Sequence, residues 1–426
     1  MNIIKNINDN QIITGLDIGS STIRCAIGQI IEPSNNIKLL GISTVDSSGI
    51  KKGIITDRDK LIESLEKVLT DAEIMANSKV QSAILSITGN NIRSMNTQAA
   101  IALNRMNGAT NNINNNRSIK SEDVFQVLDL AQAVSLPVDR DILHTMPQEF
   151  IVDTLNNIKN PVGMTGRRLE ARVHLVTAAS TAINNLINSV EELGITVDGL
   201  VYQPLASALS TLKKDEMDLG VTLVEFGAHA TDIAIYYNNA IRHSATIPIG
   251  SSSITNDIAV MLQISKNEAE SIKRKYASAL SSMSSDKLNI KSESDNNIKD
   301  RSITEKEVSN YVEARIQEIF QMIIKEVSRA DIKDPLTYGI VMTGGGAELR
   351  NIIHLAETSL GVKVRKGLPN KIEGTQEIAN KPQFTTVMGL LLWPLYSNDH
   401  IRVGLPNQGS LKNIIQKIRH TIENMF

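Results

Sequence analysis

At 426 residues the chain is too long for one hydrophobic core, and domains of roughly 100–200 residues each predict two to four of them. Hydrophobic content of 41%, charged content of 21% and a formal net charge of -2 fit a globular protein in water and exclude a general attraction for nucleic acid. The single cysteine, Cys25, excludes an intramolecular disulfide and is typical of a reducing cytosol. Residues 1–10 lack the pattern of a secretion signal, and no apolar run approaches the ~18 residues of a membrane span.

The first patterned segment, Ile12–Asp17, is an apolar strand-like run that enters the turn GLDIGSST. Asp17 could hold a Mg²⁺-bound water, and the turn residues Gly19, Ser20 and Ser21 could offer N–H and hydroxyl groups to phosphate oxygens. An ordinary β-hairpin has the same turn chemistry, so this motif alone leaves both interpretations open.

Strand-like and helix-like segments alternate along the chain, which predicts an α/β protein. The helix-like segments include Asp59–Met75 and Glu305–Ala330. Two polar stretches, 104–117 and 278–301, interrupt the pattern and are interpreted as exposed loops.

A weak internal repeat links two distant segments. ITGLDIGSSTIRCAIG, from Ile13, and TLVEFGAHATDIAIYY, from Thr222, share an apolar strand, an acid, a glycine two residues later, a small-residue turn and a second strand. Asp17 and Glu225 therefore hold equivalent positions, and two facing hairpins would form a clamp for phosphate. In the second hairpin Glu225 and Asp232 are candidate catalytic acids, near a metal or a water, although a plain hairpin is again the alternative.

A third motif, YGIVMTGGGAELRNI from Tyr338, places Gly344, Gly345 and Gly346 between a strand and a helix expected to open at Ala347. N–H groups at a helix start suit phosphate or the polar edge of a nucleotide, whereas a simple strand-to-helix turn also needs small residues. Neither GxGxxG nor GxxxxGK[ST] occurs, which argues against dinucleotide-binding and P-loop folds.

The three motifs in this order resemble the actin-like ATPase superfamily, and further segments narrow the resemblance to the FtsA family of bacterial cell-division proteins. SEDVFQVLDLAQAV, ILHTMPQEFIVD and NPVGMTGRRLEARVHLVT, within 119–177, look like the domain inserted in that family. GIKKGIITDRDKL, AIRHSATIPIGSSSITNDIA, VEARIQEIF and the terminal helix also match, so the resemblance covers nearly the whole chain.

The resemblance implies an α/β, ribonuclease H-like duplicated fold with two lobes around an ATP cleft, an inserted FtsA-type subdomain and a C-terminal amphipathic helix. The implied division is as follows: 1–90, 172–205 and 366–396 form the first-lobe core; 91–171 the inserted subdomain; 206–249 and 331–365 the second-lobe core; 250–330 the second-lobe outer subdomain; 397–410 a linker; and 411–426 the membrane-targeting helix.

The family resemblance also assigns site residues for ATP with Mg²⁺. Asp17, Gly19, Ser20 and Ser21 match the first phosphate loop; Gly227, Thr231 and Asp232 match the second, with Glu225 where the family has Asp; Gly344, Gly345 and Gly346 would lie beside adenosine. In AESIKRKY, Glu270 and Lys273 resemble the pair that contacts adenine and ribose, one helical turn apart. A solvated acid–base pair is the alternative.

Two departures bear on chemistry. Thr22 stands where the first loop usually has Lys, and Ala228, His229 and Ala230 replace two glycines and a threonine of the second. His229 could block close backbone approach, or a protonated imidazole could supply part of the lost charge. We expect ATP binding with hydrolysis too slow for a conventional enzyme, because the changes fall where transition-state charge must be stabilised.

The C-terminal segment predicts an amphipathic helix that lies on a membrane. Its apolar stripe comprises Leu411, Ile414, Ile415, Ile418 and Ile422, and the basic residues Lys412, Lys417 and Arg419 lie off the stripe. Packing of the stripe on the protein's own core or on a partner is the alternative. A terminal position after a Gly, Pro and Asn-rich linker, with a basic excess, favours an anionic membrane.

By resemblance, the protein would polymerise into actin-like filaments on the cytoplasmic side of the cell membrane at the division site. It would anchor FtsZ through that protein's C-terminal peptide and help recruit later division proteins. Residues 250–330 would grip the peptide, with Arg301 as a candidate contact. The alternatives are a soluble phosphotransferase or chaperone-type ATPase on the same fold, or another actin-like membrane scaffold such as a pilus-assembly protein.

Overall fold

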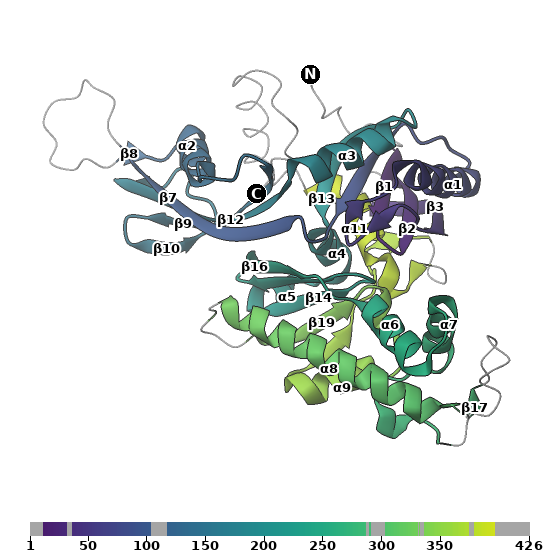
Figure 1. Ribbon diagram of the computed structural model, residues 1–426. Coiled ribbons are helices and arrows are strands. Elements are labelled where there is room, and N and C mark those ends of the chain that lie inside the picture. Colours follow the sequence, from purple (N-terminus) through teal and green to yellow (C-terminus); the bar gives the residue numbers. More distant parts are fainter. Residues whose placement is uncertain are drawn as a thin grey trace, which may run out of the picture.

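The computed structural model describes residues 12–31, 36–103, 117–286, 289–290, 303–330, 332, 336–374 and 379–396. Two lobes, each built on one sheet, lie one above the other in Figure 1, and a smaller α/β unit extends from the upper lobe to the left. Arg301, the expected linker and the expected terminal helix lie outside the described residues.

The first lobe contains a six-stranded sheet in the order β13-β6-β1-β2-β3-β21. Its strands are β1 (Ile12–Ile18), β2 (Thr22–Ile31), β3 (Asn36–Asp46), β6 (Ser82–Ile87), β13 (Thr196–Tyr202) and β21 (Ile372–Glu373). A short hairpin, β4 (Ile50–Lys51) and β5 (Ile54–Ile55), leads into α1 (Arg58–Ala76), which starts where the Asp57 side chain accepts from the Lys60 amide. Helix α1 packs on β2 and β3, and α3 (Ser180–Glu191) packs on β13.

The second lobe repeats the plan of the first. Its sheet has the order β16-β15-β14-β19-β20, with β14 (Val221–Phe226), β15 (Thr231–Tyr237), β16 (Ala240–Ile247), β19 (Ile340–Thr343) and β20 (Val364–Lys366). In both lobes the first strand pairs antiparallel with the next and parallel with a later one: β1 with β2 and β6, β14 with β15 and β19. This shared topology confirms the duplicated α/β fold expected from the internal repeat.

Helices complete the second lobe. The long α8 (Glu305–Arg329) crosses it in Figure 1, with α9 (Ile352–Leu360) nearby and α6 (Ser251–Leu262) and α7 (Lys266–Tyr276) at its right-hand end. Helix α8 has one buried face, whose residues recur at helical spacing: Val308, Val312, Ile316, Ile319 and Ile323. The smaller elements are α5 (Lys214–Leu219), η1 (Ser281–Met283), β17 (Asn289–Ile290), β18 (Ile303–Thr304) and η3 (Pro382–Phe384).

The side unit contains the segment expected as an insertion, 91–171, but its strand β12 continues to Ala179, beyond the expected end at residue 171. Its elements are β7 (Ile92–Ala102), β8 (Arg117–Ser118), α2 (Ser121–Gln132), β9 (Arg140–Val152), β10 (Leu155–Ile158), β11 (Thr165–Gly166) and β12 (Arg168–Ala179), and α2 covers the sheet. It has its own hydrophobic core, which includes Val127, Phe150, Leu169 and Val173.

The inserted unit also contacts β16, the edge strand of the second-lobe sheet. Asn96 donates to the Arg242 carbonyl at 2.9 Å, and Gln148 donates to the Ile241 carbonyl at 2.8 Å. His174, buried, places Nδ1 2.6 Å from Asn96 Oδ1 and Nε2 2.8 Å from Ser244 Oγ. Side chains of the insertion thus satisfy backbone groups that an edge strand leaves unpaired.

Two helices cross between the lobes, α4 (Gln203–Thr211) and α11 (Thr385–Tyr396). A Cβ on Gly389 of α11 would lie only 1.7 Å from the Ala206 carbonyl oxygen of α4, and a Cβ on Gly15 of β1 would lie 2.9 Å from Leu390 Cβ. Because no side chain fits at either point, α11 approaches both α4 and the first sheet at backbone distance.

Three details differ from the sequence-based expectations. Arg117, expected in a loop, belongs to β8 and pairs with Asp123 at 2.5 Å; Ser278, also expected in a loop, is buried. The Gly-rich turn forms a short 3₁₀ helix, η2 (Gly345–Glu348), and no α-helix opens at Ala347. Asn351 adopts a left-handed conformation with φ 61°, and α9 begins only at Ile352.

None of the helices in the described ranges is long and apolar enough to cross a membrane.

Candidate functional site

Two turns of matching geometry connect the first two strands of each lobe. The first loop, 19–22, joins β1 to β2, and the second loop, 227–230, joins β14 to β15. Gly19 N donates to the Thr22 carbonyl at 3.1 Å, and Gly227 N donates to the Ala230 carbonyl at 3.0 Å. A Cβ at either glycine would lie under 3.0 Å from the same carbonyl oxygen. Four amide groups donate no hydrogen bond to any other described residue: those of Ser20, Ser21, Ala228 and His229. Both turns therefore present open N–H groups, as an anion clamp requires.

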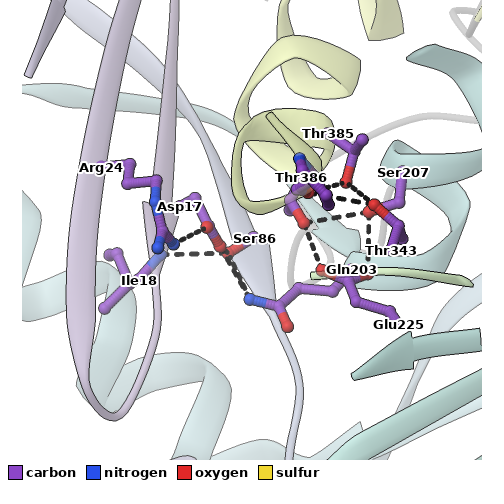
Figure 2. Close-up of polar contacts among 11 residues, drawn as sticks. Asp17, Ile18, Arg24, Ser86, Gln203, Ser207, Glu225, Thr343, Thr385 and Thr386 are labelled. Atoms are coloured by element: carbon purple, nitrogen blue, oxygen red, sulfur yellow. Dashed lines mark hydrogen bonds and ion pairs between the residues drawn. The ribbon is translucent and has the colours of Figure 1, made fainter. Parts of the chain in front are cut away.

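Asp17, two residues before the first loop, is buried and held by three side chains (Figure 2). Its Oδ1 accepts from Ser86 Oγ at 2.8 Å and Gln203 Nε2 at 2.7 Å, and its Oδ2 accepts from Arg24 Nη1 at 3.3 Å. The carboxylate is fixed in place with its oxygens already engaged. A role in holding a metal-bound water stays a prediction.

Glu225 holds the equivalent position in the second lobe. Ser207 of α4 donates to its Oε2 at 2.7 Å, and Thr386 of α11 donates to its Oε1 (Figure 2). Burial, followed by the negative charge of Asp232, raises the pKa of Glu225 to about 8, although the two hydroxyl donors oppose the shift. Glu225 therefore keeps a proton at neutral pH.

Asp232 faces Glu225 across the hairpin β14–β15 and is also buried. It accepts from Thr88 Oγ1 at 2.7 Å and from the hydroxyl groups of Thr246 and Tyr202. Burial raises the pKa of Asp232 to about 6 despite these donors. Because Thr88 follows β6 of the first lobe, this hydrogen bond joins the two lobes beside the loops.

The Gly-rich turn lies directly beside the second loop. A Cβ on Gly344 would lie 2.7 Å from the Phe226 carbonyl oxygen, and a Cβ on Gly346 would lie 2.5 Å from the Phe226 ring. Gly344 also has φ 83°. Gly345 faces open space instead. Two of the three predicted glycines are thus needed for packing, and the third leaves room for a ligand.

Glu270 and Lys273 form a partly buried pair, in which Lys273 is buried and Glu270 is half-buried and also pairs with the exposed Arg274. Lys273 Nζ lies 2.6 Å from Glu270 Oε2 and donates to Thr255 Oγ1 at 2.8 Å and to the Ser251 carbonyl at 3.2 Å. Burial alone would raise the pKa of Glu270, but the hydrogen bonds of Lys273 and Thr255 lower it to about 2. The pair joins α7 to α6; its contact with adenine and ribose stays a prediction.

His229 does not provide the positive charge that its sequence position suggested. Burial, then the charges of Lys52, Lys51 and Lys266, lower the pKa of His229, which favours the neutral imidazole. Its Nδ1 is buried and finds no hydrogen-bond partner among the described residues. A neutral ring with an unpaired Nδ1 can still donate one hydrogen bond to a ligand.

The residues present fit a polyanionic phosphate tail. Open amides come from both loops, and there is space beside Gly345. Within the described residues, no three metal-ligating side chains gather into one group, and the Mg²⁺ site expected at Asp17 stays a prediction. Sequence reasoning missed Ser86, Gln203, Ser207 and Thr386, which orient the acids.

A second concave feature lies between α6 and α8. This α6–α8 groove has a volume of about 350 Å³ and is lined by Asn256, Asp257, Val260, Met261, Tyr311, Ala314, Arg315 and Glu318. Arg315 joins the helices through Asp257, with Nε 2.6 Å from Oδ2, and also pairs with Glu318. Val260 is 73% exposed and Met261 47% exposed. The groove therefore combines apolar side chains with paired charges.

Comparisons with known proteins agree with this architecture. The family model described as "Cell division protein FtsA" matches residues 222–389, and that described as "SHS2 domain inserted in FTSA" matches residues 89–177. Curated relatives with the same description include proteins of Pseudomonas aeruginosa (35% identity; 92% of this chain, 91% of the relative) and Bacillus subtilis (34% identity; 90% and 83%).

Solved structures of similar fold include a PilM-PilN type IV pilus biogenesis complex and an MreB protein. The first has TM-score 0.63 and 14% identity over 89% of this chain and 97% of the other. The second, MreB 5 of Spiroplasma citri bound to AMPPNP, has TM-score 0.54 and 13% identity over 97% of this chain and 99% of the other. At such identities they show the fold alone, which is actin-like.

Proposed function

This chain belongs to the FtsA family of cell division proteins, and from this premise we propose that it is an ATP-binding, membrane-anchored, actin-like protein of the division machinery. It binds the cytoplasmic side of the cell membrane at the division site, polymerises, anchors FtsZ and helps recruit later division proteins. Family membership makes a soluble phosphotransferase, a chaperone-type ATPase or a pilus-assembly scaffold the weaker alternatives.

The ATP-binding step is supported by one main observation, the matched loops that end the paired strands of both lobes. Gly19 and Gly227 make the same turn. Each loop also contains amide groups that donate no hydrogen bond to any other described residue. A bound Mg²⁺ would neutralise phosphate charge. Gly345 leaves space for the nucleoside end.

Hydrolysis is proposed to be slow. Glu225 keeps a proton at neutral pH because its pKa is about 8, so it is a poor base for water. Thr22, Ala228 and His229 also remove a cation and two glycines from the positions nearest the phosphates in the family pattern. A steady-state turnover near ~1 per second would contradict this part of the proposal.

Anchoring is assigned to the amphipathic segment 411–426, which lies outside the described residues and is argued from its sequence alone. Its apolar stripe would enter the membrane interface, and Lys412, Lys417 and Arg419 would contact anionic headgroups.

The FtsZ peptide is proposed to dock in the α6–α8 groove. Val260 and Met261 offer exposed apolar surface for an apolar side chain of the peptide, and Arg315, Asp257 and Glu318 offer charges of both signs. Arg301, four residues before α8 in the sequence, lies outside the described residues and stays a candidate contact.

Sedimentation with liposomes tests membrane anchoring and its dependence on ATP. Full-length protein and a variant ending at Gly409 are mixed with anionic and neutral vesicles, with and without ATP and Mg²⁺. We expect only the full-length protein to pellet with anionic vesicles, and ATP to change the amount or produce filaments. If both proteins stay in the supernatant under every condition, the anchoring proposal is wrong and a soluble ATPase becomes the better interpretation.

The peptide site has a separate test. Binding of a fluorescent FtsZ C-terminal peptide is measured by anisotropy for wild type, Val260→Glu and the control Ile74→Glu, a residue of α1 that is similarly exposed. We expect Val260→Glu to weaken binding about tenfold, because a charge replaces apolar contact, and Ile74→Glu to bind as wild type. Equal binding by all three proteins would remove the groove from the proposal.

A further inference from the structure

Three exposed lysines near the two loops lack partners. In the described part of the chain, the side chains of Lys51, Lys52 and Lys266 make no ion pair and no hydrogen bond. Most other cations near the loops are engaged: Arg24 with Asp17, and Lys273 with Glu270. Unpaired like charges that share one region repel one another, so they favour an anionic ligand.

Lys52 is held against the first loop by its hairpin. It occupies a left-handed conformation, φ 54°, at the tip of β4–β5, and the next amide, Gly53 N, donates to Ser20 Oγ at 3.0 Å. A Cβ on Gly53 would lie 2.4 Å from the Thr88 carbonyl oxygen, in the turn whose Thr88 hydroxyl donates to Asp232. The hairpin tip is therefore fixed between the first loop and the turn that joins the lobes.

Lys266 comes from the other lobe. It is the first residue of α7, after the N-cap Ser265, and α7 is tied to the start of α6 by Lys273, which donates to the Ser251 carbonyl. The start of α6 is in turn fixed on the second loop: Ser251 N donates to the Gly227 carbonyl at 2.9 Å. Lys266 thus belongs to a rigid unit built on the second loop.

The lysines of both lobes act on the same side chain. The charges of Lys52, Lys51 and Lys266 each disfavour protonation of His229, in addition to burial. His229 lies in the second loop, where the family pattern has glycine, and its unpaired Nδ1 is buried there. Cations from both lobes therefore act on one residue of the second loop, which lies beside the open amide groups of that loop.

We propose that Lys51, Lys52 and Lys266 bind the β- and γ-phosphates of a nucleoside triphosphate and replace the cation that the first loop lacks at Thr22. This inference depends on the proposed ATP binding. Charge-assisted hydrogen bonds from residues of both lobes to one phosphate tail link the lobes through the ligand. Because AMP has neither a β- nor a γ-phosphate, this assignment distinguishes a nucleoside triphosphate from a monophosphate.

The test measures ATP, ADP and AMP affinity by isothermal titration calorimetry with the full-length protein. Lys52→Ala and Lys266→Ala are compared with wild type and with two controls, Lys67→Ala on α1 and Lys275→Ala on α7, both exposed. We expect each cleft variant to lose about tenfold in ATP affinity and the double variant more, with AMP unchanged and both controls equal to wild type. Inorganic tripolyphosphate should compete with ATP for wild type and not for the double variant.

The outcomes separate the two proposals. If wild type binds neither ATP nor ADP, ATP binding itself is wrong and this inference falls with it. If wild type binds ATP and the cleft variants keep its affinity and salt dependence, only the lysine assignment is overturned. Circular dichroism of each variant confirms that an affinity loss reflects the missing cation, because these exposed side chains support no fold contact.

Discussion

Gln203 and Ser207 stand one helical turn apart on α4 and donate to acids of different lobes. Gln203 Nε2 lies 2.7 Å from Asp17 Oδ1, and Ser207 Oγ lies 2.7 Å from Glu225 Oε2 (Figure 2). Residues at i and i+4 share one helix face, so a single rigid helix holds both acids next to the two loops. Helix α4 therefore fixes the position of one acid relative to the other.

Replacing Gln203 tests this arrangement. Gln203→Ala removes one of three donors from the buried Asp17 carboxylate, and we expect a loss of about 1–3 kcal/mol in the free energy of unfolding together with weaker ATP binding. Urea denaturation and calorimetric titration measure the two effects. Gln317→Ala, on the exposed side of α8, serves as control. Unchanged stability and affinity in Gln203→Ala would show that the hydrogen bond does not position Asp17.

The proton on Glu225 predicts a pH dependence of stability. The folded-state pKa of about 8 lies above the ordinary value of 4.5, so the folded state keeps a proton that the unfolded state loses between these values. The stability that this proton contributes to the folded state is complete below pH 4.5 and is lost as pH rises through about 8. Glu225→Gln cannot ionise, and we expect its thermal midpoint to fall less steeply with pH and to exceed that of wild type in alkaline buffer. Parallel profiles for wild type and Glu225→Gln would contradict a proton on this carboxyl group.

The hairpin pattern allowed the sequence to predict the architecture but not the polar contacts. The register of β1–β2 and β14–β15 follows from the repeat, and it places Asp17 and Glu225 at matching positions, as predicted. Ser86 and Gln203 hold Asp17 from 69 and 186 residues away, and no local pattern encodes such contacts. A weak signal existed in QPLASALST, where polar residues recur four apart in an apolar helix.

Restoring the family pattern in the loops should strengthen nucleotide binding. Thr22→Lys adds a cation at the end of the first loop, whose turn hydrogen bond from Gly19 uses only the backbone carbonyl of Thr22 and is retained. We expect about tenfold tighter ATP binding, with little change in turnover while Glu225 stays protonated. Titration and a phosphate-release assay measure the two quantities. An unchanged affinity would mean that Lys51, Lys52 and Lys266 already neutralise the phosphates, and a fall would mean that the longer side chain obstructs the first loop.

His174 should contribute to the stability of the inserted unit. Both ring nitrogens are hydrogen-bonded, and burial, with the charge of His243, lowers the pKa of His174 to about 3, so the ring is neutral. His174→Leu leaves Asn96 and Ser244 short of a partner, and we expect a loss of about 1–3 kcal/mol in urea denaturation. His354→Leu, at an exposed position, should change little. Equal losses in both variants would show that the hydrogen bonds of His174 make no special contribution to the stability of the insertion.

The contact of the insertion with β16 also limits how one molecule can join another. An uncovered edge strand is a template for pairing with a strand of a second molecule, and β16 carries side chains of the insertion along that edge. The opposite edge is β20, which is only three residues long. Neither edge of this sheet offers a long template for strand addition, so the second-lobe sheet is protected from uncontrolled growth by β-pairing.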